Sequence, residues 1–205
     1  GNRYYAEGEF ENIPMMMIDS MLRGVVCSTE GTATARLTIE GQGRMAHLNG
    51  AVEVKDLSTM AQFTQVRYNA PTAHIEVKDN HLLAKDVRVY DQEKNSGTYN
   101  MDVSLEHLSN VAFNVRVEPR KMIVLNTTAE DNDLFYGKLY ASGVANFTGN
   151  KSGTRLDISG STEGDSHFYM PLSSKTDAST ADFVTFVKPI NTAIPSSFKI
   201  TFAME

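Results

Sequence analysis

Side chains that could perform catalysis or bind a metal ion are few in this chain and show no recognisable spacing. The five histidines are scattered along 205 residues. His74 and Glu76 are two positions apart, so on a β-strand both would point to one face and could form a surface metal site. Glu130, Asp131 and Asp133 form an acidic cluster, but they lack the alternating acidic residues and glycine of a calcium-binding loop. We interpret all of these residues as solvent-facing strand and turn positions.

The chain also lacks an arrangement that would activate a nucleophile. It contains no Gly-x-Ser-x-Gly motif, and no pairing of Cys27 with a histidine is evident. Cys27 is the single cysteine, so an internal disulfide is excluded, and we interpret its thiol as a small buried apolar group. The sequence therefore predicts a protein that is not an enzyme and has no cofactor or metal ion.

Composition limits the partners of this protein. Apolar residues make up 41% of the chain and charged residues 21%, which is ordinary for a folded protein with a substantial core. The formal net charge is −6, and no dense cluster of lysine and arginine occurs. Nucleic acid is therefore excluded as a main partner, because its binding requires a basic surface. No apolar run reaches the length of a transmembrane helix.

Alternation of apolar and polar residues is the dominant pattern from Thr32 to the end of the chain. The apolar positions in five such runs are Ala33, Ala35, Leu37 and Ile39; Ala73, Ile75 and Val77; Tyr99, Met101, Val103 and Leu105; Val111, Phe113, Val115 and Val117; and Phe198, Ile200, Phe202 and Met204. Successive side chains of a strand point to opposite faces, so each run gives a strand with one apolar and one polar face. Short turn segments such as 78–80, 91–97 and 148–153 make consecutive strands antiparallel neighbours. The sequence predicts an all-β fold, an elongated antiparallel sheet folded lengthwise as a taco-like structure or an open sandwich or roll.

One short helix is expected near the N-terminus, over residues 13–23. Ile13, Met16 and Met17 fall on one helical face, Pro14 suits a first helical turn, and Gly24 could end the helix. We therefore expect an N-terminal segment with a short helix over residues 1–24 and a β domain over residues 25–205. Both ends of the chain suggest a piece of a longer protein.

The apolar face of the sheet is the remaining candidate for function. In one interpretation two sheets close on each other and fill the space with their own side chains. In the other, a curled sheet leaves an apolar trough in which an acyl chain could lie, since each buried CH₂ group contributes about 0.8 kcal/mol. The residues expected to line the trough are Leu37, Ile39, Val52, Val54, Ile75, Val77, Val87, Val89, Met101, Val103, Phe113, Val115, Leu139 and Phe147.

Several segments resemble the C-terminal region of the TamB family, the translocation and assembly module subunit of diderm bacteria. The central one runs from residue 122 to residue 149 and contains Phe135-Tyr136-Gly137, Gly143 and Gly149. Upstream, residues 31–41 and 47–52 are similar to glycine-bounded strand units of the family, and residues 87–91 resemble its strand before a glycine-containing turn. Downstream, residues 168–172 and 182–187 are similar to further strands, the latter in the form found in Bacteroidetes.

This resemblance implies a taco-like sheet with a hydrophobic interior and a role in outer-membrane biogenesis. It implies a periplasmic protein, anchored in the inner membrane by a helix that this chain lacks, that reaches a TamA-like barrel in the outer membrane. It also implies a groove for phospholipid acyl chains or for unfolded strands of outer-membrane proteins. The family has no catalytic residues to transfer to this chain.

The alternative to a TamB-like protein is a closed β-sandwich that binds carbohydrate or acts in adhesion, with Tyr4, Tyr5, Tyr90 and Tyr136 as its platform. In addition, the uncovered edges of the sheet are expected to pair with each other at high protein concentration, because free strand edges recruit other strands.

Overall fold

The computed structural model describes residues 2–22, 24–43, 45–106, 110–131, 135–150, 152–169 and 198–204. His107, Asp133 and the segments 170–172 and 182–187 of the TamB resemblance lie outside the described residues. So do residues 177–182, whose small polar side chains predict a loop, and Pro189 and Pro195, which bracket a segment predicted not to be a strand.

Eleven strands and one short helix make up the part of the chain that the structure describes. They are β1 (Arg3–Pro14), α1 (Met17–Met21), β2 (Val26–Gln42), β3 (Met45–Ala61), β4 (Val66–Lys78), β5 (His81–Tyr90), β6 (Ser96–Glu106), β7 (Asn110–Arg120), β8 (Met122–Thr127), β9 (Tyr136–Asn150), β10 (Gly153–Tyr169) and β11 (Phe198–Met204). All strands belong to one antiparallel sheet in the order β1-β2-β3-β4-β5-β6-β7-β9-β10-β11, with β8 pairing with β9 beside this path.

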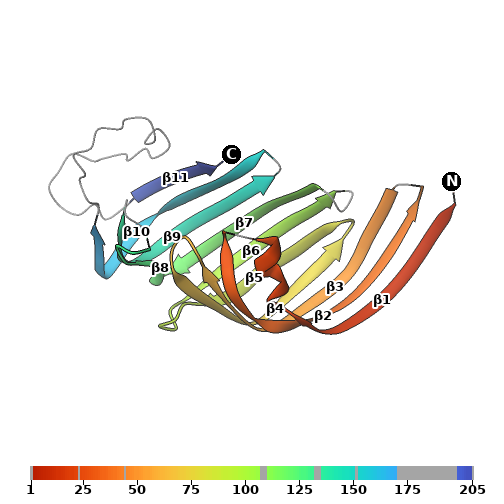
Figure 1. Ribbon diagram of the computed structural model, residues 1–205, viewed down its shortest axis with the longest axis horizontal. Coiled ribbons are helices and arrows are strands. Elements are labelled where there is room, and N and C mark those ends of the chain that lie inside the picture. Colours follow the sequence, from red (N-terminus) through yellow and green to blue (C-terminus); the bar gives the residue numbers. More distant parts are fainter. Residues whose placement is uncertain are drawn as a thin grey trace.

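The sheet is open, because β1 and β11 lie at its two ends and do not pair with each other (Figure 1). The all-β, antiparallel fold predicted from alternation is thus confirmed, and the sheet does not close into a sandwich or barrel. Almost every connection is a short hairpin between neighbours. This follows from the turn residues between the apolar runs, since short links can join only antiparallel strands.

The long strands bend along their length where residues adopt left-handed backbone angles. Asn12 in β1 (φ 54°), Gly31 in β2 (φ 112°), Asp56 in β3 (φ 52°) and Asp86 in β5 (φ 51°) mark these places. The pairing register shifts at Asn12, Gly31 and Asp86, as expected for β-bulges, which bend a strand and increase its twist. Figure 1 shows the resulting curvature of β1, β2 and β3.

Gly31 is required at this bend by both its backbone angle and its surroundings. A Cβ atom there would lie 2.8 Å from the carbonyl oxygens of Lys55 and Asp56 on the neighbouring strand. The sequence pair Glu30-Gly31, which looks like a turn before the first strand, is therefore a bulge inside β2.

The bend brings β8 against the concave face of the sheet. Met122 of β8 is 1% exposed and packs in the core with Val54, Ala73 and Val87. The Tyr68 hydroxyl donates a hydrogen bond of 3.1 Å to the carbonyl oxygen of Ile123, tying β4 to β8. The core therefore lies between the main sheet and β8, on the apolar side of the strands.

The expected helix over residues 13–23 is shorter than the sequence suggested. Ile13 and Pro14 belong to β1, where they lie opposite Ala33 and Thr32, and the helix covers only Met17–Met21. Proline is tolerated at the end of an edge strand, so pairing with β2 prevails over the helical pattern. β1 itself was not expected, and it forms the edge of the same sheet. The division at residues 24 and 25 stays a prediction.

Candidate functional site

The fourteen residues expected to line a trough are all buried or partly buried. Val54, Val77, Val87 and Val89 are buried, with exposed fractions of 2–9%. The partly buried ones are Leu37, Ile39, Val52, Ile75, Met101, Val103, Phe113, Val115, Leu139 and Phe147. Whether they line a site for a ligand stays a prediction.

Cross-strand pairing places most of these side chains on one face. Val52 of β3 lies opposite Ile75 of β4. Farther along the sheet, Val115 of β7 lies opposite both Met101 of β6 and Phe147 of β9. Directly opposed residues of an antiparallel pair share a face, so these positions form rows across the sheet.

A second row lies closer to the turn between β4 and β5 and to the connection between β6 and β7. Val77 of β4 lies opposite Leu82 of β5, Leu82 lies opposite Val103, and Val103 lies opposite Phe113. The rings of Phe113 and Phe147 join this row to the preceding one, with centroids 4.8 Å apart. Leu82, which the prediction left out, is thus part of the same row. Leu139 lies apart from both rows, opposite Leu125 of β8.

Burial divides the apolar face into a covered and a partly uncovered part. The residues packed around Met122, such as Val54 and Ala73, are fully buried. Val103, Phe113 and other side chains closer to the hairpin ends keep part of their surface exposed. This part of the face therefore presents apolar atoms to solvent over several adjacent strands, and extended apolar surface of this kind typically binds another apolar group.

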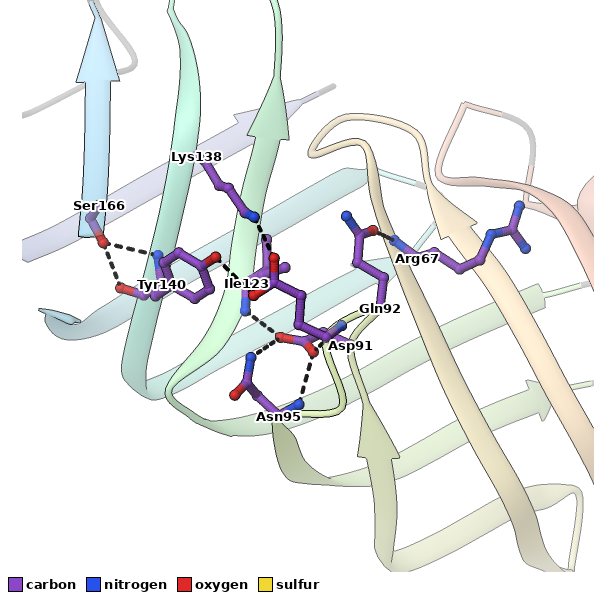
Figure 2. A network of polar contacts seen from close by, with 9 residues as sticks. Arg67, Asp91, Gln92, Asn95, Ile123, Lys138, Tyr140 and Ser166 are labelled. Carbon is purple, nitrogen blue, oxygen red and sulfur yellow. Dashed lines mark hydrogen bonds and ion pairs between the residues drawn. The ribbon is translucent and has the colours of Figure 1, made fainter. Parts of the chain in front are cut away.

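A buried carboxylate, Asp91, holds β8 in its place over the sheet (Figure 2). Asp91 is 2% exposed. Its Oδ1 accepts the backbone N–H groups of Glu93 and Asn95 at 2.9 Å, and its Oδ2 accepts Asn95 Nδ2 at 2.9 Å and the Ile123 N–H at 2.7 Å. Four donors satisfy this carboxylate, which makes its burial tolerable. The β5–β6 turn is thereby fixed to β8.

Glu93, an exposed residue of the same turn, connects the turn to β9. Glu93 accepts hydrogen bonds from Lys138 and, at 2.8 Å, from the Tyr140 hydroxyl. These bonds, the one from Lys138 first, lower the pKa of Glu93, and the bond to Glu93 raises the pKa of Lys138. Figure 2 shows Glu93's neighbours Asp91 and Gln92 in the same turn, with Gln92 accepting the Arg67 N–H at 3.4 Å.

The polar residues considered for chemistry do not assemble into a site among the described residues. His74 contacts Glu53 rather than Glu76, and both are exposed. Asp131 accepts two hydrogen bonds from Thr128, both at 2.7 Å, and these lower its pKa. No group of three potential metal ligands occurs in the described part of the chain. Cys27 is partly buried rather than buried.

The tyrosines proposed as a carbohydrate platform do not gather on one surface. Tyr4 and Tyr5 lie in β1 at one edge of the sheet, Tyr90 ends β5, and Tyr136 begins β9, where its ring stacks on Tyr169.

These features define an all-β protein built on one open, bent antiparallel sheet with an apolar concave face. The model of the TamB C-terminal domain family matches residues 82–204, which is more than half of the chain, and the chain belongs to this family. The resemblance seen in the sequence is thus confirmed, although its segments between residues 31 and 52 lie outside the matched range. No curated protein and no solved structure matches the chain.

Membership of the family sets the general role of the chain. The TamB family consists of non-enzymatic envelope proteins that take part in outer-membrane biogenesis and work with TamA-type partners, and it implies an envelope location. Within the described residues no helix has the length and hydropathy needed to cross a bilayer.

Sequence reasoning missed the Asp91 contact, which connects residues far apart in the chain. The only local indication was its position, since Asp91 directly follows the strand ending at Tyr90 and opens a short turn, where aspartate commonly binds backbone N–H groups.

Proposed function

We propose that the partly uncovered apolar face of this chain holds acyl chains of phospholipids that pass between the inner and outer membranes. The observation that carries the proposal is the row formed by Val77, Leu82, Val103 and Phe113, which crosses four strands without a polar residue. The protein would act in the periplasm, attached to the inner membrane in its full-length form and engaged with a TamA-like barrel.

The energetics of an apolar row suit transport better than tight, fixed binding. A chain of about sixteen carbons could gain roughly 10 kcal/mol by burial before the costs of association. The row offers no polar group to fix the ligand at one position. A bound acyl chain would therefore meet small barriers as it slides from strand to strand.

The same face could instead hold unfolded strands of outer-membrane proteins, whose apolar side chains alternate with polar ones. This second candidate follows from the family role in outer-membrane biogenesis. The two candidates differ in the molecule that would be found against the row.

Site-specific photocrosslinking in cells distinguishes these outcomes. A photoreactive residue at Phe113, in the full-length protein, is expected to capture phospholipid. The matched control is Asn114, which is exposed and adjacent in sequence but on the other face of β7. Capture of outer-membrane protein chains at Phe113 would favour the second candidate. Equal labelling from Phe113 and Asn114, or none from Phe113, would overturn both.

A further inference from the structure

The ladder between β4 and β5 is interrupted in the middle of the sheet. Pairs join Glu76 to Leu83, Val77 to Leu82 and Lys78 to His81 near the hairpin turn, and a single pair joins Asn69 to Tyr90 at the far end. No ladder pair connects residues 70–75 with residues 84–89, all of which the structure describes. Over this stretch β4 still pairs with β3, and β5 still pairs with β6 apart from a bulge between Ala84 and Val87.

Two residues account for the missing ladder pairs. Pro71 of β4 has no backbone N–H and cannot donate to a ladder. Asp86 of β5 has a left-handed backbone (φ 51°) and lies in a bulge between Ala84 and Val87. Its N–H donates to the Asn100 side chain on β6 at 3.0 Å, so it is turned away from a regular ladder. We call the stretch formed by residues 70–75 and 84–89 the β4–β5 seam.

An open cavity of about 720 Å³ lies on the β4–β5 seam. Ala73, Ala84 and Val87 contribute to its lining and are themselves almost fully buried, so they form its floor on the apolar side of the sheet. Exposed residues of both strands, including Thr72 and Arg88, form its rim. The volume falls in the range of about 300–1,000 Å³ that is usual for ligand sites.

We propose that the β4–β5 seam is an insertion site for an extended polypeptide strand with alternating apolar and polar side chains. Each wall of the seam is a strand edge over six residues without its regular ladder partner, a length of about 20 Å. The ligand that pairs with two facing strand edges at once is a further strand, as in peptide insertion into the centre of a sheet.

The lining defines the side chains that such a strand would carry. Side chains directed inward would meet the apolar floor and Met101, while those directed outward would meet the rim. The acidic groups of the rim are Glu76 and Asp86 and the basic ones are Lys85 and Arg88, so both signs are present and neither dominates. Alternation, rather than net charge, is therefore the feature that the seam would select. Transmembrane strands of outer-membrane barrels have this alternation.

This inference relies on the proposed function only for the biological source of the strand. Either proposal can fail while the other holds, because they are tested at different residues. Hydrogen exchange is measured in residues 70–75 and 84–89, and photocrosslinking is performed at Phe113.

Hydrogen exchange of the whole chain with a defined probe tests the inference. The probe is an eight-residue peptide in which valine and threonine alternate between terminal lysines. At saturating peptide, we expect exchange of the amides in 70–75 and 84–89 to slow roughly tenfold or more, because ladder hydrogen bonds must open before exchange. The control probe is the same peptide with N-methyl groups on its valines, which blocks hydrogen bonding along one edge.

The two probes separate insertion from addition at an outer edge. A strand that inserts needs both of its edges, so the methylated peptide should leave the β4–β5 seam unprotected. That peptide could still add to the free edge of β1, where protection would appear in residues 3–14. Protection confined to β1 or β11 with the unmodified peptide, unchanged exchange in the seam, or equal protection of the seam by both peptides would overturn the inference.

Discussion

The backbone N–H of Ile123 donates a hydrogen bond of 2.7 Å to the carboxylate of Asp91, thirty-two positions earlier in the chain. This contact joins the β5–β6 turn to β8, and β8 covers the buried part of the apolar face. The Asp91 carboxylate thus fixes β8 over the apolar face, together with the Tyr68 hydroxyl and the pairing of β8 with β9.

Replacing Asp91 by asparagine should destabilise the fold by about 2–3 kcal/mol. The amide can accept through one oxygen only, and its NH₂ group would face buried N–H donors. Urea unfolding of Asp91→Asn against wild type measures the change. Asp86→Asn is the matched control, since Asp86 is exposed and asparagine tolerates its left-handed backbone equally well. A loss below 0.5 kcal/mol for Asp91→Asn would show that the carboxylate does not hold β8.

Tyr68 should make the stability of the protein fall at alkaline pH. Burial, and secondarily the charge of Asp91, raise the pKa of Tyr68 above its usual value of 10.0. The unfolded chain therefore loses this proton first, and stability that is complete below about pH 10 decreases as the pH rises above it. Tyr68→Phe should cost about 1 kcal/mol at pH 7 through the lost bond to Ile123.

The same variant should show a shallower decline of unfolding free energy between pH 10 and pH 11 than wild type. Burial also raises the pKa of Tyr99, so the slope should decrease rather than vanish. Parallel curves for the two proteins would contradict the assignment to Tyr68.

Substitution of Gly31 by alanine should disturb the bend of the sheet. Its Cβ would lie 2.8 Å from two backbone oxygens of β3, and φ is 112°, so we expect a loss of about 2–3 kcal/mol, visible as a lower melting temperature. Gly24→Ala provides the control, because φ is 80° there but no atom lies within 4 Å of the added carbon. Equal losses would mean that backbone angle alone, and not the close approach to Asp56, requires glycine at position 31.

Alternation was sufficient to predict the sheet and the face of most trough residues, because the side-chain period of a strand is fixed at two. It failed for β1, where the face that continues the apolar face of β2 carries only Ala6 and Gly8 between the aromatic residues Tyr4 and Phe10. Phe10 covers Gly8, whose added Cβ would lie 2.9 Å from the Phe10 ring, so a single large residue serves two positions. Residues 1–12 therefore read as polar and aromatic with no clear period.

The bend and the β4–β5 seam could not be predicted, since each depends on where separate strands come side by side. Asp56 and Gly31 look like turn residues in sequence and act as bulges only in the context of their neighbours. The role of Asp91 likewise requires the position of Ile123, which local pattern does not specify.

The free edge of β1 should cause self-association of the chain. Among the described strands β1 pairs with β2 alone, and Tyr5 is 64% exposed on this strand. We expect sedimentation at millimolar concentration to reveal larger species, and Tyr5→Lys to reduce them, because lysine on an edge strand opposes pairing. Met45→Lys places the same charge at an exposed methionine in β3, away from the edge, and should have no effect. A strictly monomeric wild type would exclude this association.

A polar side chain in the partly uncovered row should interrupt acyl-chain binding. Val103 lies between Leu82 and Phe113 in the row, and it is only partly buried, so Val103→Asn should remove apolar contact at a cost to stability of about 1–2 kcal/mol. Binding of a fluorescent fatty acid by the purified chain should weaken about tenfold, equivalent to about 1.4 kcal/mol. Asp102→Asn, on the opposite face of β6, is the control and should bind as wild type does. If both variants bind the fatty acid equally well, the row around Val103 is not where the acyl chain lies.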